Sequence, residues 1–162
     1  MENLNLRVVK DSFAATIPLV KLEYHFYKPW LNEDDSKNVL FISSHGFGHA
    51  SGKMFYPASG EEVKEDENLP GGILNIPLEF GTDSSMFRKV YREKVFPRLV
   101  EFSPDFIFIS AGFDAHVNDD INNHMTGLDE NDYKWVTDEL CKIANLTCEG
   151  RIVSALEGGY RI

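Results

Sequence analysis

The chain has 162 residues, of which 43% are hydrophobic and 26% are charged, so its size and composition fit one globular domain. No apolar stretch is long enough to span a bilayer, and the amino terminus lacks the pattern of a signal peptide. The formal net charge of −10 argues against direct binding of nucleic acid through its phosphates. The two cysteines, Cys141 and Cys148, indicate a reducing compartment and no cysteine-based metal site.

The first part of the chain carries weak signals, and the pattern sharpens after residue 37. Residues 1–37 follow neither a helical nor a strand period, with short extended pieces at most at Val8-Val9 and at residues 17–20. The run Val-Leu-Phe-Ile-Ser at residues 39–43 then predicts a buried strand. Residues 44–72 are rich in glycine, proline and acidic side chains, which is typical of a long functional loop. A short strand at residues 73–76 follows, and we expect Pro77 to close it.

Helices and strands alternate through the rest of the chain. Asp83 or Ser84 can cap a helix, and Pro97 is expected to kink it or to start its final segment. Its apolar positions recur at helical spacing: Phe87, Val90, Tyr91, Val95, Leu99 and Phe102. A buried strand at residues 105–110 and a polar loop at 116–128 come next. A second helix starts near Asp129, and a last strand covers residues 151–156. The buried stripe of the second helix is expected to be Tyr133, Val136, Leu140 and Ile143.

This alternation predicts an α/β fold with a parallel sheet built from right-handed strand–helix–strand units. Because parallel strands end at one edge of a sheet, three loops should meet there. These loops are Ser44-His45, Asp114-Ala115-His116 and Gly158-Gly159-Tyr160. The sequence therefore predicts that groups far apart in the chain share one site.

Two of these loops carry candidate chemical groups. Asp114 follows a buried strand, where metal-binding and catalytic carboxylates often lie, whereas a capping role in a turn is the alternative. For His116, a solvated side chain is the favoured interpretation. Tyr160 could donate a hydrogen bond to a developing oxyanion, although its spacing alone favours an ordinary loop. No G-x-S-x-G motif is present, which disfavours a serine hydrolase.

Taken together, these segments resemble the zinc-dependent histone deacetylase family, and the residues of their motifs are more similar to its class II branch than to class I. The resemblance implies a three-layer arginase/deacetylase-like α/β fold that is incomplete, with the family's amino-terminal half missing. We therefore interpret residues 1–162 as a partial catalytic domain, in which residues 38–160 match the family and residues 1–37 are poorly defined. The matching segments, in the family's order, are residues 39–45, 54–60, 75–77, 109–116 and 155–160.

By this resemblance, Asp114 corresponds to a zinc ligand. Tyr160 corresponds to the tyrosine that hydrogen-bonds the acetyl carbonyl and its tetrahedral oxyanion. Tyr56 falls on the wall of the acyl-lysine tunnel, where the family usually has phenylalanine, and Ile121 falls beside the tunnel mouth. The resemblance also implies substrate-binding roles for Phe55 and Gly158, and a structural potassium site at Ser43 and Ser44.

The chain also departs from the family. Members carry a His-His pair and an Asp-x-His segment upstream of the first buried strand, and residues 1–37 contain neither, with His25 as their one histidine. Because catalytic zinc takes three protein ligands and a water, we expect little or no deacetylase activity from this chain alone. The alternative is a non-catalytic remnant that keeps the fold for protein–protein contact. A flavodoxin-like binding domain is a third interpretation, but it leaves Asp114 and Tyr160 unexplained.

The resemblance further implies the partners of the chain. The substrates would be acetylated lysine peptides such as histone tails, other acetylated proteins or acetylpolyamines, and corepressor-type proteins would be possible partners. No direct contact with nucleic acid or membrane is expected. The family resemblance implies residence in the nucleus, the cytoplasm or both. The sequence does not choose between them, because no basic localisation cluster is visible.

Overall fold

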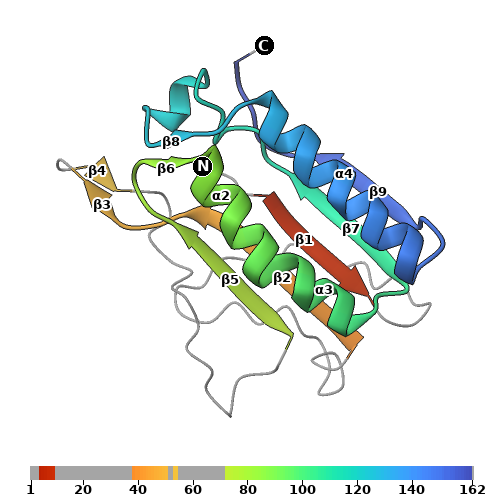
Figure 1. Ribbon diagram of the computed structural model, residues 1–162. Coiled ribbons are helices and arrows are strands. Elements are labelled where there is room, and N and C mark those ends of the chain that lie inside the picture. The colour runs from red at the N-terminus through yellow and green to blue at the C-terminus, as the bar shows by residue number, and fades with distance from the viewer. Residues whose placement is uncertain (1–3, 10–37, 51–52, 55–71, 162) are drawn as a thin grey trace, which may run out of the picture.

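A five-stranded sheet with the order β5-β2-β1-β7-β9 forms the centre of the structure (Figure 1). The computed structural model describes residues 4–9, 38–50, 53–54 and 72–161. The strands of the sheet are β1 (Leu4–Val9), β2 (Val39–Gly46), β5 (Ile73–Leu78), β7 (Phe106–Ala111) and β9 (Ile152–Leu156). The four strands expected from residue 39 onward are thus confirmed, with small shifts at their ends. The expected extended piece at residues 17–20 lies outside the described residues.

The directions of the strands bring the candidate loops to one edge. Strand β2 is parallel to β5, and β7 is parallel to β9. Strand β1 runs antiparallel to both β2 and β7, so these two strands run in the same direction as each other. The carboxyl ends of β2, β5, β7 and β9 therefore lie at one edge, beside β6 and β8 in Figure 1.

The strand order also reverses within this sheet. From β2 the chain adds β5 on one side, and it then returns across the sheet to β7 and β9. In open α/β sheets, the crevice at such a reversal is the usual place for a ligand. Here β1 lies at the reversal, which differs from the all-parallel sheet that the sequence predicted. An antiparallel strand fits because its backbone N–H and C=O groups can pair on both sides without a crossover helix.

One continuous helical segment follows β5. It consists of α2 (Ser84–Val90), the π-helical turn η1 (Tyr91–Val95) and α3 (Phe96–Phe102). The Asp83 side chain accepts the Met86 backbone N–H at 2.9 Å, which confirms the predicted cap. Pro97 stands at the start of α3, as expected. Because proline has no N–H and its ring crowds the preceding turn, the helical ladder widens just before it, and the Phe96 N–H donates to the Tyr91 carbonyl.

Helix α4 (Glu130–Thr147) packs beside this segment on the same face of the sheet (Figure 1). Asp129 caps it, and Asp132 completes a capping box by accepting the Asp129 backbone N–H at 3.1 Å. The four predicted stripe residues Tyr133, Val136, Leu140 and Ile143 are all buried. The described helices thus form one layer over one face of the sheet.

The core lies between the sheet and this helical layer. Its strand residues alternate along each strand, as expected when one face of the sheet is covered. They are Leu40, Ile42, Ile76, Leu78, Ile107, Ile109 and Ala111. Contrary to expectation, β5 continues through Pro77 to Leu78. Since β5 is an edge strand of the described sheet, the missing N–H of Pro77 leaves no central ladder position empty.

Short elements connect the main ones. Two two-residue pairs form small ladders, and a 3₁₀ turn lies in the polar loop after β7. These are β3 (His49–Ala50) with β4 (Lys53–Met54), β6 (Thr82–Asp83) with β8 (Thr126–Gly127), and η2 (Asp120–Asn122). Among the described residues, no helix has both the length and the apolar character needed to cross a membrane.

Candidate functional site

Asp114 lies in the loop that follows β7, and its side chain is 0% exposed. It lies near Tyr133 of α4, whose hydroxyl donates to the Phe113 carbonyl at 3.4 Å. Burial raises the pKa of Tyr133, and the negative charge of Asp114 raises this pKa further. The structure therefore places a carboxylate in a low-dielectric position at the end of a central strand, where it can serve as a ligand for a cation.

The loop after β9 runs directly beside the loop that carries Asp114. The Phe113 N–H donates to the Gly158 carbonyl at 2.9 Å, and the Glu157 N–H donates to the Ala111 carbonyl at 2.9 Å. Gly159 has a φ of +114°, and a Cβ at this position would lie 3.0 Å from the Phe113 Cβ. Glycine is required there by both the backbone conformation and the space. These contacts bring the residues on either side of Asp114 and Tyr160 together, as the sequence predicted.

Tyr160 itself lies at the surface of this edge, with its side chain 57% exposed. Gly158, just before it, is buried, and Ile121 on η2 is exposed. Tyr160 is therefore exposed at the edge of the sheet where the loop of the buried Asp114 also lies. Phe55 and Tyr56, two of the predicted substrate-binding residues, lie outside the described residues.

The third predicted loop, at the end of β2, lies across β1 from Asp114. The hydroxyl of Ser43 hydrogen-bonds Nδ1 of His45 at 3.0 Å, and both side chains are buried. The hydroxyls of Ser44 and Tyr91 are 2.7 Å apart, so β2 is tied to the helical layer. Burial raises the pKa of Tyr91 despite this hydrogen bond from Ser44. The potassium site expected at Ser43 and Ser44 stays a prediction.

His116 is held within its own loop. Its Nδ1 accepts the Asn118 backbone N–H at 3.1 Å, and its Nε2 lies 3.3 Å from a carboxylate oxygen of Glu130. Both ring nitrogens therefore have partners on the protein surface. These contacts hold the His116 ring within its own loop, and the interpretation of His116 as a solvated side chain stays a prediction.

The described residues do not, on their own, fit a catalytic zinc ion. Such an ion takes three protein ligands and a water. Among the side chains that the structure describes, those of residues 38–48 and 72–161, no group of three or more histidine, cysteine, aspartate or glutamate residues is close enough to hold a metal. Asp114 is a single candidate donor within this set, and its assignment as a ligand stays a prediction.

Sequence reasoning missed one residue of this edge, Asp119. Its carboxylate is 6% exposed and accepts three backbone N–H groups, from Ile121 at 2.9 Å, Tyr160 at 2.7 Å and Arg161 at 3.2 Å. Burial raises the pKa of Asp119, but the hydrogen bonds from these backbone groups outweigh it and lower the pKa. The local sequence Asn-Asp-Asp gave no periodic signal that separates this aspartate from its solvated neighbours.

This lowered pKa predicts an acid-dependent loss of stability. A carboxyl group whose pKa is lower in the folded than in the unfolded chain stabilises the fold above its unfolded value of about 3.9. That contribution disappears as the pH falls through the folded value. Between pH 6 and pH 3, the free energy of unfolding measured in urea should therefore fall more steeply for the wild type than for the Asp119→Asn variant. Parallel curves for the two proteins would contradict the assignment.

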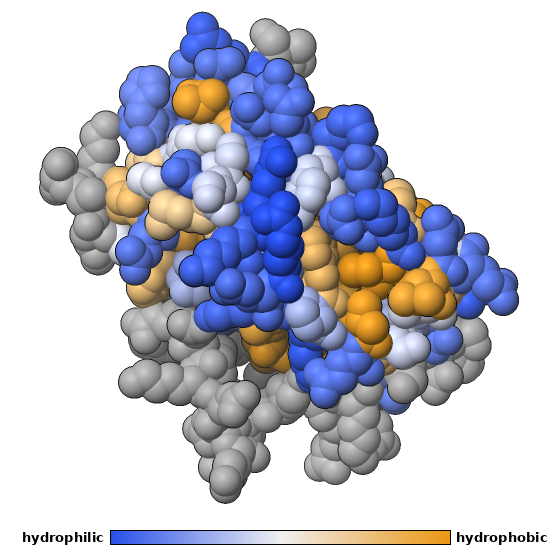
Figure 2. Space-filling model, in the orientation of Figure 1, coloured by the Kyte–Doolittle hydropathy of each residue, from blue (hydrophilic) through white to orange (hydrophobic). Residues whose placement is uncertain are grey.

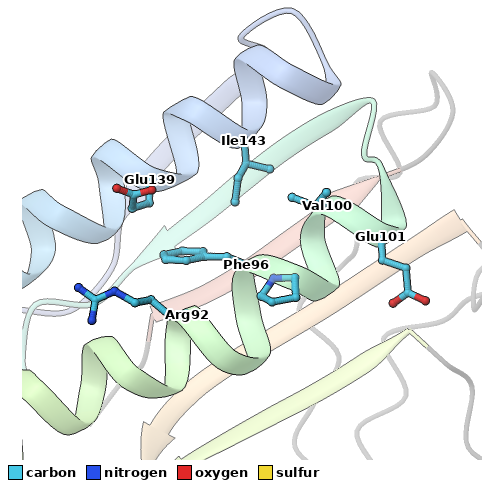
Figure 3. Close-up of a pocket in the computed structure, with 7 residues that line it drawn as sticks. Arg92, Phe96, Val100, Glu101, Glu139 and Ile143 are labelled. Carbon is cyan, nitrogen blue, oxygen red and sulfur yellow. The ribbon is translucent and has the colours of Figure 1, made fainter.

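A groove on the helical layer is distinct from this edge. Figure 2 shows an apolar patch between α3 and α4, and Figure 3 shows the side chains that line the groove there. The groove has a volume of about 520 Å³. Its lining belongs to η1, α3 and α4 and contains none of the residues at the strand ends. The lining residues are Arg92, Phe96, Pro97, Val100, Glu101, Glu139 and Ile143. We therefore place the candidate site at the strand ends.

Comparison with known sequences gives a consistent result. A profile of the family described as "Histone deacetylase domain" matches residues 24–162. Type-2 histone deacetylase 2 of Dictyostelium discoideum is 40% identical over 136 residues, which cover 82% of this chain and 8% of that protein. The chain thus spans a small part of this longer relative.

Two solved structures share the fold. The HDA15 HD domain superposes with a TM-score of 0.60 at 31% identity, over 75% of this chain and 32% of that one. Acetylpolyamine aminohydrolase from Burkholderia pseudomallei superposes with a TM-score of 0.57 at 25% identity, over 76% of this chain and 33% of that one. The chain covers about a third of each of these solved chains.

Proposed function

Because this chain belongs to the histone deacetylase domain family, we propose that it forms part of the active site of a zinc-dependent enzyme that hydrolyses acetyl-lysine amides in histones or other proteins. The observation that carries the proposal is the adjacency of the Asp114 and Tyr160 loops at the carboxyl ends of the strands.

In this proposal, Asp114 and Tyr160 have different tasks. Asp114 offers a buried carboxylate as one ligand of the metal. The Tyr160 hydroxyl donates a hydrogen bond to the acetyl carbonyl oxygen as negative charge develops on it. Gly158 and Ile121 would contact the substrate, together with Phe55 and Tyr56.

The donor set of the described residues is incomplete, so we expect the 162-residue chain alone neither to retain zinc stoichiometrically nor to hydrolyse an acetyl-lysine peptide. The measurement is the zinc content after dialysis, together with acetate release from an acetylated histone-tail peptide. One equivalent of retained zinc with acetate release would overturn the proposal that the site is partial.

The roles of Tyr160 and Asp114 are tested in a longer protein that includes the upstream coding sequence. If that sequence supplies a His-His pair and an Asp-x-His segment, zinc binding and deacetylation should appear. Tyr160→Phe should then lower kcat by about 10²–10³-fold, because one oxyanion donor is lost while the aromatic ring is kept. An unchanged kcat for Tyr160→Phe would contradict the role of the phenol, and full zinc retention by Asp114→Asn would contradict that of the carboxylate.

A second candidate function is protein–protein contact without catalysis. It is favoured by the exposed apolar side chains Val153 and Leu156 on β9, which is an edge strand of the described sheet. An upstream reading frame that encodes the histidine motifs would support the enzyme. An upstream stop codon or unrelated sequence would support this second function, with corepressor-type proteins as the partners we would test.

A further inference from the structure

Asp119 connects two loops that come from different parts of the chain. Its Oδ1 accepts the Ile121 N–H and thereby caps η2 within its own loop. Its Oδ2 accepts the N–H groups of Tyr160 and Arg161 in the loop after β9. A single buried carboxylate thus uses one oxygen to fix its own turn and the other to hold the segment that carries Tyr160.

We propose that Asp119 is the positioning residue for Tyr160, and that its carboxylate fixes the backbone from which the phenol reaches the rim beside Asp114. The inference rests on the proposed function for the task of Tyr160. Asp119 acts through the Tyr160 backbone, so it is not assigned a contact with substrate.

The geometry gives this clamp its strength. Hydrogen bonds to an ionised carboxylate are shorter and stronger than those between neutral groups, and the Tyr160 N–H lies 2.7 Å from Oδ2. The same segment is fixed on its other side, where the Phe113 N–H donates to the Gly158 carbonyl and Gly159 packs against the Phe113 side chain. The backbone of residues 158–161 is therefore fixed from two directions. The hydrogen bond to Asp119 is the one that the backbone N–H of Tyr160 itself donates.

A neutral amide cannot replace this carboxylate. In Asp119→Asn, the side chain keeps one oxygen acceptor, and its NH₂ group must face the N–H of either Ile121 or the Tyr160–Arg161 pair. On that side the amide NH₂ and the backbone N–H are both donors and cannot hydrogen-bond each other. One of the two loops therefore loses its hydrogen bond to residue 119. Asp120→Asn is the matched control, because exposed Asp120 accepts from the Arg161 guanidinium at 3.0 Å and makes the same change of charge one residue away.

The test is amide hydrogen exchange on the full 162-residue chain, read by NMR together with the ring signals of Tyr160. Asp119→Ala removes both acceptor oxygens and should speed exchange at the Tyr160 and Arg161 amides by about 10- to 100-fold, as expected for the loss of hydrogen bonds to a charged group. Asp119→Asn should speed exchange at whichever of the two loops faces its NH₂ group. Amides in β7 and α4 should change much less, and the Tyr160 ring signals should move toward those of a freely rotating tyrosine. Asp120→Asn should leave the Tyr160 amide within about threefold of the wild type, because surface ion pairs contribute little.

Three results would overturn the inference. These are unchanged exchange at Tyr160 in Asp119→Ala, an equal effect of Asp120→Asn, or a uniform acceleration across β7 and α4, which would indicate a purely structural role. If Asp119→Ala does not fold, the wild type decides. Its Asp119 carboxyl ¹³C signal and Tyr160 amide ¹H signal should then share one pH midpoint, and different midpoints would refute the clamp. Because no readout needs zinc or substrate, failure here is distinguishable from failure of the proposed function.

Discussion

Removal of residues 1–9 is expected to abolish cooperative unfolding, because β1 is the strand that joins the two halves of the sheet. Strands β5 and β2 form one parallel pair and β7 and β9 form the other, and β1 hydrogen-bonds to β2 on one side and to β7 on the other. Without β1, two strand edges would present unpaired N–H and C=O groups, and such edges promote aggregation. Thermal melts followed by circular dichroism, with light scattering for the oligomeric state, provide the measurement.

A single substitution tests the same strand. Leu6 pairs with Ile42 of β2 on one side and with Ile109 of β7 on the other. Its backbone N–H therefore points toward one of these two strands. Leu6→Pro removes that donor, whereas the control Leu6→Ala keeps it. We expect Leu6→Pro to lower the melting temperature well below that of Leu6→Ala. Equal melting temperatures, or a monomeric truncated chain with an unchanged melt, would show that β1 does not hold the sheet together.

Arg88→Met is expected to lower the free energy of unfolding by about 3 kcal/mol, which is the lower end of the range for breaking a buried ion pair. Nε of Arg88 donates to Oδ1 of Asp132 at 2.7 Å, and the Asp132 side chain is 0% exposed whereas that of Arg88 is 28% exposed. The substitution leaves the carboxylate buried, with its remaining donors Ser84 Oγ at 2.6 Å and the Asp129 N–H at 3.1 Å. The lower end of the range applies because the arginine is partly solvated.

Arg92→Met is the matched control. The guanidinium groups of Arg88 and Arg92 both lie over the ring of Trp135, at 5.4 Å and 4.9 Å from its centroid. Both variants therefore lose a similar cation–π contact, and the difference between them isolates the pair with Asp132. Urea unfolding should show Arg92→Met within about 1 kcal/mol of the wild type. Similar losses in the two variants would assign the effect to Trp135 instead.

Most of the described fold could be predicted from local patterns. The strands after residue 37 are short apolar runs, and both helices begin at an aspartate cap and carry buried residues at helical spacing. Solved neighbours confirm the arginase/deacetylase fold, of which this chain covers a part. The effect of Pro97 could be predicted because a proline changes the hydrogen bonds of the helical turn in which it lies. The effect of Pro77 could not, because its tolerance depends on β5 lying at the edge of the described sheet.

The position of β1 could not be predicted for a similar reason. The sequence around β1 gives only a short extended signal at Val8-Val9, and nothing local shows that β2 and β7 leave a place between them. The meeting of the Asp114 and Tyr160 loops was predictable from parallel strand ends, whereas Asp119 was not. Its role depends on a contact with Tyr160, 41 positions away in the chain, that no periodicity reveals.

The orientation of β1 has a practical consequence for anyone who handles this protein. Leu4 pairs with Ser44 and Asn5 pairs with Ser110, so the strand enters the sheet at the same rim where Asp114 and Tyr160 lie. An affinity tag or fusion partner placed before Leu4 would begin next to that rim and could shield it from a peptide. An amino-terminal purification tag should therefore be cleaved off before binding or labelling is measured.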